Sequence, residues 1–136
     1  MEIFEPYSHS IAVLALWGLM VQVLVMLTMK GRTDEDRAIC GNIIRDYSNP
    51  VYRQSRAFWN AMEISPLFVT GTIACILSGA DPLRVNILTS VFLVARIVMA
   101  FVHIKTENQK LRSLTFMVGW VAALALGITG FVNAVL

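Results

Sequence analysis

The chain has 136 residues, of which 57% are hydrophobic and only 15% are charged, with a formal net charge of +2. This length suits one domain, and soluble domains usually carry about a quarter of charged residues, so an ordinary soluble protein is excluded. The charge is concentrated between four long apolar stretches, which predicts an integral membrane protein. We expect one membrane domain over residues 1–136, in contact with lipid and without a nucleic acid partner.

The four apolar stretches predict membrane-spanning helices, each needing about 20 apolar residues. In chain order we expect helices over about residues 9–29, 51–79, 83–104 and 113–135. Backbone polar groups must be satisfied inside each segment in lipid, which favours helices. The start of the chain has two acids and no basic residue, so the first stretch is interpreted as a retained span and not as a cleaved signal. The predicted fold class is an all-α, up-down bundle of four transmembrane helices.

The positions of the basic residues predict the orientation in the membrane. Basic residues mark the cytoplasmic side of a membrane protein. Nine of the eleven Lys and Arg residues lie in or beside the connections between the first and second and between the third and fourth helices. Arg84 alone lies on the other side, and Arg96 lies within a span. Both termini are therefore expected on the non-cytoplasmic side.

Polar side chains interrupt the second and third apolar stretches. Arg56, Asn60 and Glu63 follow one another at spacings that place them on one helix face. Glu63 lies roughly 10 Å beyond Arg56, and Arg96 lies roughly 12 Å inside the third helix, so the two reach similar depth. We therefore predict an ion pair between Glu63 and Arg96, either direct or bridged by a ligand. Charged groups within a membrane usually face the bundle interior.

These polar residues allow two interpretations. A buried Glu–Arg pair with a neighbouring Asn can serve only to fix the register of the helices. Against this, the cationic groups outnumber their acidic partners toward the cytoplasmic half, and surplus guanidinium groups indicate an anionic ligand. The sequence thus predicts a cavity without identifying its occupant.

Cysteine and metal chemistry are not indicated. Cys40 falls in a charged connection and Cys75 in an apolar stretch, so a disulfide is not expected. His9 and His103 do not complete a ligand motif with them, and no metal site is predicted.

RAFWNAMEISPLF (56–68) has the pattern R-A-x-x-N-x-x-E-x-x-P-L-F. This pattern resembles the signature of the MAPEG family, the membrane-associated proteins of eicosanoid and glutathione metabolism. FLVARIVMAFVH (92–103) is similar to the third helix of the family, and KLRSLTFMVGW (110–120) to the opening of its fourth helix. The resemblance covers roughly residues 50–125.

The resemblance implies a homotrimer that binds glutathione between neighbouring protomers near the cytoplasmic side. It implies that Arg112 is the catalytic residue, whose cation stabilises the glutathione thiolate, because a nearby cation lowers the pKa of a thiol. An apolar co-substrate would arrive from the lipid. The residues that it implies for contact with glutathione are Arg56, Asn60, Glu63, Arg96, His103 and Ser113.

These expectations leave the function open between two classes. The first is a glutathione-dependent transferase or peroxidase acting on lipophilic electrophiles. The alternative is a non-catalytic trimeric scaffold or accessory subunit, favoured because Met99, His103 and Phe116 stand where the family often has Tyr or, at Met99, His. A catalyst that uses another thiol or anionic cofactor is a third possibility.

Overall fold

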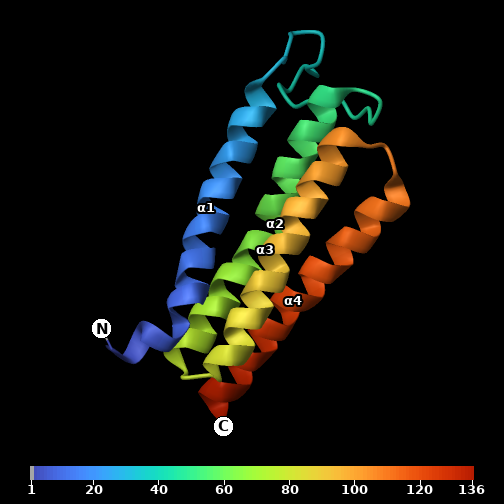
Figure 1. Cartoon of the computed structure of the whole chain (residues 1–136). Helices are drawn as coiled ribbons and strands as arrows, with labels where there is room; N and C mark the ends of the chain where they lie inside the picture. The colour runs from blue at the N-terminus through green and yellow to red at the C-terminus, as the bar shows by residue number, and fades with distance from the viewer. Residues whose placement is uncertain (1) are drawn as a thin grey trace.

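Four long helices make up the body of the protein (Figure 1). The computed structural model describes residues 2–136, in which a short 3-10 helix, η1, precedes the long helices α1 to α4. Each long helix is long and apolar enough to cross a membrane. The expected all-helical, four-span architecture is therefore confirmed, and the chain is a multi-pass membrane protein. The bounds are η1 Glu2–Tyr7, α1 Ser8–Met29, α2 Pro50–Leu77, α3 Pro82–Lys105 and α4 Gln109–Val135.

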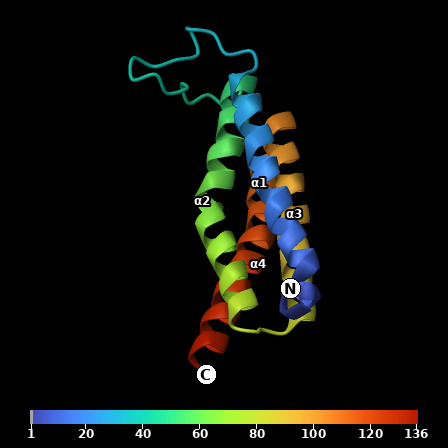
Figure 2. The same ribbon diagram turned by 90° about the vertical axis from the view of Figure 1, so that its left-hand side faces the viewer.

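The helices run alternately up and down (Figures 1 and 2). The long connection of residues 30–49 and the short connection between α3 and α4 lie at one end of the bundle. The tight turn between α2 and α3 lies at the other end, together with the two ends of the chain. α4 is inclined to the other three helices in Figure 1, and it reaches the far end of the bundle beside the end of α2.

Side-chain caps determine where three of the helices begin. Asn49 accepts a hydrogen bond from the backbone N–H of the second residue of α2, and Asp81 accepts one from the backbone N–H of the third residue of α3. Each is followed by a proline, Pro50 and Pro82, whose fixed φ suits the first position of a helix. Asn108 caps α4. The caps satisfy N–H groups that have no partner inside the helix.

Two helix ends differ from those expected from hydropathy. α2 ends at Leu77, before residue 79, because Gly79 adopts a left-handed conformation with φ of +69° that terminates the helix. α4 begins at Gln109, before residue 113, because the Asn108 side chain caps it within the polar connection. Arg112 consequently lies in the first turn of α4 and not in a loop.

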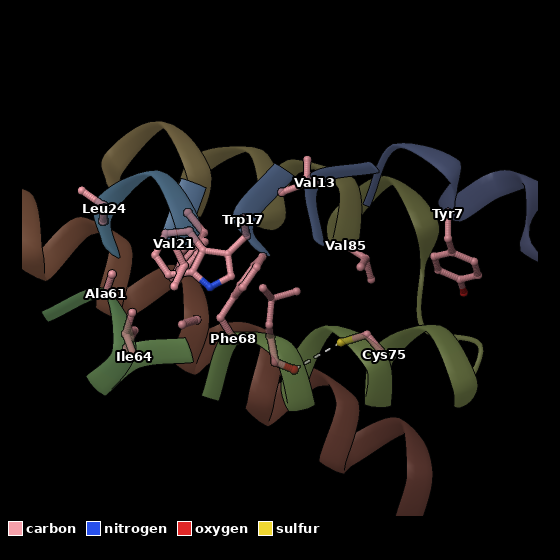
Figure 3. Packing of buried hydrophobic residues seen from close by; sticks show 14 of the residues in the cluster. Tyr7, Val13, Trp17, Val21, Leu24, Ala61, Ile64, Phe68, Cys75 and Val85 are labelled. Atoms are coloured by element: carbon pink, nitrogen blue, oxygen red, sulfur yellow. Dashed lines mark hydrogen bonds between the residues drawn. The ribbon is translucent and has the colours of Figure 1, made fainter. Parts of the chain in front are cut away.

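An aromatic cluster fills the middle of the bundle (Figure 3). The rings of Phe68 and Phe92 stack with centroids 3.7 Å apart, and the Trp17 indole meets the Phe92 ring edge-on at 5.0 Å. All three side chains are buried. The Trp17 N–H donates to the Ser65 hydroxyl at 3.0 Å, so the indole carries no unsatisfied donor. This cluster joins α1, α2 and α3.

Glycines bring α4 close to α2 near the end of the bundle that carries the termini. A Cβ atom on Gly71 would lie only 2.8 Å from the backbone N of Gly127, and one on Gly130 would lie 3.0 Å from the backbone N of Cys75. The Cys75 thiol donates to the Leu126 carbonyl at 3.2 Å, the dashed line in Figure 3. Small residues permit such close packing of helices in lipid.

Candidate functional site

A cavity of about 570 Å³ opens near the end of the bundle that carries the long connection. Six of the seven residues expected to bind or activate glutathione line it; only Arg96 does not. α2, α3, α4 and the long connection all contribute to its walls. Its lining residues are Tyr47, Arg56, Asn60, Glu63, Met99, His103, Gln109, Arg112, Ser113, Phe116 and Met117.

The polar face of α2 forms one wall. The Arg56 guanidinium donates two hydrogen bonds to the Glu63 carboxylate, at 2.8 and 3.3 Å, which bridges two turns of the helix. The pair is not sealed, since the side chains of Arg56 and Glu63 are 32% and 53% exposed. Asn60 lies between them in sequence and is buried. The wall therefore presents one positive and one negative group side by side.

The direct form of the predicted ion pair between Glu63 and Arg96 is wrong, because among residues 2–136 Glu63 forms its ion pair with Arg56. The form bridged by a ligand stays a prediction. Arg96 is 3% exposed and lies behind the wall of the cavity. Its guanidinium donates to the backbone O of Asn60 at 2.9 Å and also to the Asn60 side-chain oxygen. A third bond reaches the Met99 sulfur at 2.8 Å. Through these contacts Arg96 holds the Asn60 side chain in place at the wall of the cavity.

Arg112 projects from the first turn of α4 into the cavity. It is 9% exposed, and its Nη1 atom has no hydrogen-bond partner within the described residues. His103, which is 5% exposed, likewise has an unpartnered Nδ1. Buried polar atoms are almost always hydrogen-bonded, so each such group requires an explanation. A polar ligand in the cavity would supply one.

Ser113 and Gln109 line the cavity beside Arg112. The Ser113 hydroxyl donates to the Gln109 carbonyl at 3.1 Å, one turn earlier in α4. The first turn of a helix carries partial positive charge and unpaired N–H groups. The start of α4 and the Arg112 side chain therefore bring positive charge to the same side of the cavity.

Tyr47, from the long connection, is a cavity residue that the sequence did not indicate. Its ring lies over the Arg112 guanidinium, with the central carbon of Arg112 4.0 Å from the ring centroid. Tyr47 precedes α2 in an irregular segment, where no periodicity reports the direction of a side chain. The run RDYSNP (45–50) gave only the signal of a solvated segment leading into a helix.

Short-range hydrogen bonds shape this connection. The Asp46 carboxylate accepts from the hydroxyl and the backbone N–H of Ser48, which lowers the pKa of Asp46. The Asp36 carboxylate accepts from the backbone N–H and the hydroxyl of Thr33 and from the side chain of Asn49. These bonds lower the pKa of Asp36, the Thr33 N–H contributing most. Through Asn49, the connection is tied to the cap of α2.

A second cavity, of about 590 Å³, lies on the other side of the ion pair of α2. Arg56 and Glu63 line both cavities, and Trp59, which is 54% exposed, lines only the second. This face of α2 is therefore open in the single chain. The remaining lining residues are Asn42, Ile43, Arg45, Tyr52 and Ser55.

Within residues 2–136 no group of three His, Cys, Asp or Glu side chains could hold a metal ion. Cys40 is exposed and Cys75 is buried, and neither forms a disulfide in the described part of the chain.

A known protein family matches the chain. The model of the MAPEG family matches residues 9–132, nearly the whole chain. No curated protein matches the chain significantly.

Proposed function

The chain belongs to the MAPEG family, and on that premise we propose that it is a glutathione-dependent transferase or peroxidase acting on lipophilic electrophiles. The observation that carries the proposal is the position of Arg112, which lines a cavity of about 570 Å³ and whose buried Nη1 atom has no hydrogen-bond partner within residues 2–136. Arg112 has the catalytic role in this proposal. Arg56, Asn60, Glu63, His103 and Ser113 line the binding site, and Arg96 supports it.

The charges of the cavity suit glutathione, which has two carboxylates, one ammonium and a thiol. Arg56 and Glu63 lie side by side, as the carboxylate and ammonium of an amino-acid end group do. A guanidinium forks onto a carboxylate, and a carboxylate receives an ammonium. Two Arg and one Glu give these lining groups a net charge of +1, which favours an anionic ligand.

Arg112 would act by electrostatics alone. Bound glutathione would supply a thiolate, which is the nucleophile, and the thiol proton would leave to solvent. A guanidinium stays protonated, so Arg112 can stabilise the negative charge of sulfur without exchanging a proton. The apolar side chains of Phe116 and Met117, on the same wall as Arg112, suit a lipophilic co-substrate that enters from the membrane.

We further propose that three copies assemble with their α2 faces covered. Glu63 lies halfway along the 28 residues of α2, and its side chain is 53% exposed in the single chain. A charged group facing lipid at mid-bilayer costs roughly 2.5–3.5 kcal/mol. Covering the open face, including Trp59, with a second copy removes this cost, and the second cavity would then lie at the contact between protomers. The excess of basic residues supports placing both termini on the non-cytoplasmic side.

The test of the proposed activity compares Arg112→Ala with Lys110→Ala in purified protein. Both variants remove one cation from the start of α4, but only Arg112 lines the cavity. Conjugation of glutathione to 1-chloro-2,4-dinitrobenzene should fall about 10- to 100-fold in the first variant, the range expected for losing a charged hydrogen bond. The second variant should keep its activity. Absence of glutathione binding by the unmodified protein would refute the proposal.

One observation favours the rival function of a trimeric scaffold. Met99 and Phe116 place a thioether and a phenyl ring on the cavity wall, where they donate no hydrogen bond. Thermal unfolding with and without glutathione distinguishes the two functions. A ligand at 100 times its Kd stabilises the folded protein by about 2.7 kcal/mol, whereas a scaffold without the site gains nothing.

A further inference from the structure

The position of Tyr47 is unusual for a residue in a connection between helices. Its ring covers the Arg112 guanidinium at 4.0 Å, which explains part of the burial of Arg112. Tyr47 also lines the same cavity as Arg56 and His103. Stacking of a ring on a guanidinium leaves the N–H groups at the edge free to bind an anion. Tyr47 therefore orients Arg112 without consuming its donors.

Arg53, in the first turn of α2, holds Tyr47 in place. Its guanidinium donates to the carbonyls of Tyr47 and Ser48 at 2.7 and 2.9 Å. The same group reaches the carbonyl of Ile104 at 3.3 Å and the Glu107 carboxylate at 3.3 Å. One side chain thus joins the connection before α2 to the end of α3 and to the turn before α4. Arg53 itself does not line the cavity.

The ring of Tyr52 adds a second support. It meets the Tyr47 ring edge-on with centroids 5.0 Å apart. Tyr52 lines the second cavity and not the first. The Tyr52 side chain therefore contacts Tyr47 without lining the cavity that Arg112 lines.

We propose that Tyr47 is a ligand-contacting residue whose phenol donates a hydrogen bond to the anionic group held by Arg112, and that Arg53 is its positioning residue. This inference rests on the proposed function, in which the anionic group is the thiolate of glutathione. Tyr47 keeps its proton throughout, and the thiol proton leaves to solvent. The connection between α1 and α2 would thus supply the phenol that Met99 and Phe116 cannot supply from α3 and α4.

The test measures the pKa of the bound thiol from the ultraviolet absorbance of the thiolate against pH. Tyr47→Phe keeps the ring over Arg112 and removes only the hydroxyl, so the thiol pKa should rise by about one unit. Turnover should fall about tenfold below that pKa and recover at higher pH. Tyr52→Phe is the matched control and should leave both quantities unchanged.

The role of Arg53 is tested by Arg53→Lys alone and combined with Tyr47→Phe. Arg53→Lys should raise the thiol pKa in the same direction, because an ammonium that bonds the carbonyls of Tyr47 and Ser48 has no separate Nε–H group to bond the Ile104 carbonyl and anchor the side chain to α3. The double variant should be no worse than Tyr47→Phe, since both act through one hydroxyl. A purely structural role for Arg53 would lower thermal stability without moving the thiol pKa.

The outcomes separate this inference from the proposed function. If the unmodified protein binds glutathione as thiolate and Tyr47→Phe leaves the thiol pKa and turnover unchanged, the role of Tyr47 is refuted and that of Arg112 is not. If the unmodified protein does not bind glutathione, both fail together. An unchanged thiol pKa in Arg53→Lys refutes the positioning role alone.

Discussion

Gly71→Ala should destabilise the protein because it forces α2 and α4 apart where they are closest. The new Cβ would lie 2.8 Å from the backbone N and 3.0 Å from the Cα of Gly127. Ordinary contact begins near 3.4 Å, so the backbone of α4 must move by roughly 0.6 Å. Overpacking of this kind usually costs about 1–3 kcal/mol. A backbone cannot rotate away as a side chain can.

Two other glycines provide matched controls for this substitution. A Cβ on Gly127, at the same crossing, would meet only the end of the Leu67 side chain, at 3.1 Å, and this side chain can rotate. A Cβ on Gly18 would meet nothing within 4 Å. Gly127→Ala should therefore cost less than Gly71→Ala, and Gly18→Ala should be close to neutral.

The assay is unfolding in mixed detergent micelles, followed by circular dichroism at one protein-to-detergent ratio. Arg112 lies 15 residues from Gly127, about 22 Å along α4, so a change of tilt at the crossing is amplified at the cavity. Gly71→Ala should consequently weaken glutathione binding as well as stability. Equal stability of all three variants would refute the close approach of the two helices.

Two further predictions concern buried and loop polar groups. Arg96→Lys should cost about 1–3 kcal/mol in the same assay, because Nη2 of the guanidinium bonds both oxygens of Asn60 while Nη1 bonds the Met99 sulfur, and lysine has no second nitrogen for that contact; an unchanged stability would contradict this. The pKa of Asp36 is lowered by Thr33 and Asn49. Its contribution to the stability of the folded connection is therefore present above pH 3.8 and is lost as the pH falls through the folded-state pKa. Pepsin cleavage of residues 30–49 should accelerate over that range, and Asp36→Asn should remove the part of this acceleration that Asp36 contributes, while Asp46 keeps its own part.

The helices were predictable because they depend on composition averaged over about 20 residues. Four apolar stretches and the turn signals between them gave the number of helices and their order. The first residue of α4 was not predictable from hydropathy, since the side chain of Asn108 and not apolarity decides where the helix begins. The same limit applies at the end of α2, where the backbone of Gly79 stops the helix.

The candidate site was predictable in its residues but not in its pairings. Helical periodicity placed Arg56, Asn60 and Glu63 on one face, and they share one cavity wall. Estimates of depth could not decide which Arg pairs with Glu63, because Arg56 and Arg96 both reach it by length alone. The structure shows why Glu63 pairs with Arg56. The Arg96 guanidinium donates to the backbone O of Asn60 and forms no ion pair with Glu63 among the described residues.

The glycine-dependent contacts of α4 explain why the cavity lined by Arg112 lies toward the end of the bundle that carries the long connection. At Gly71 and Gly127 the backbones of α2 and α4 touch, and no space remains. Nearer the cavity, Gly119 leaves room for the Arg96 side chain, which a Cβ there would meet at 2.8 Å. The buried guanidinium thus lies between α3 and α4 and keeps α4 from closing on α2. The inclination of α4 therefore produces a tight apolar contact with α2 at one end and leaves room for a charged cavity at the other. The position of Arg112 beside that cavity depends on the contact and on the cavity.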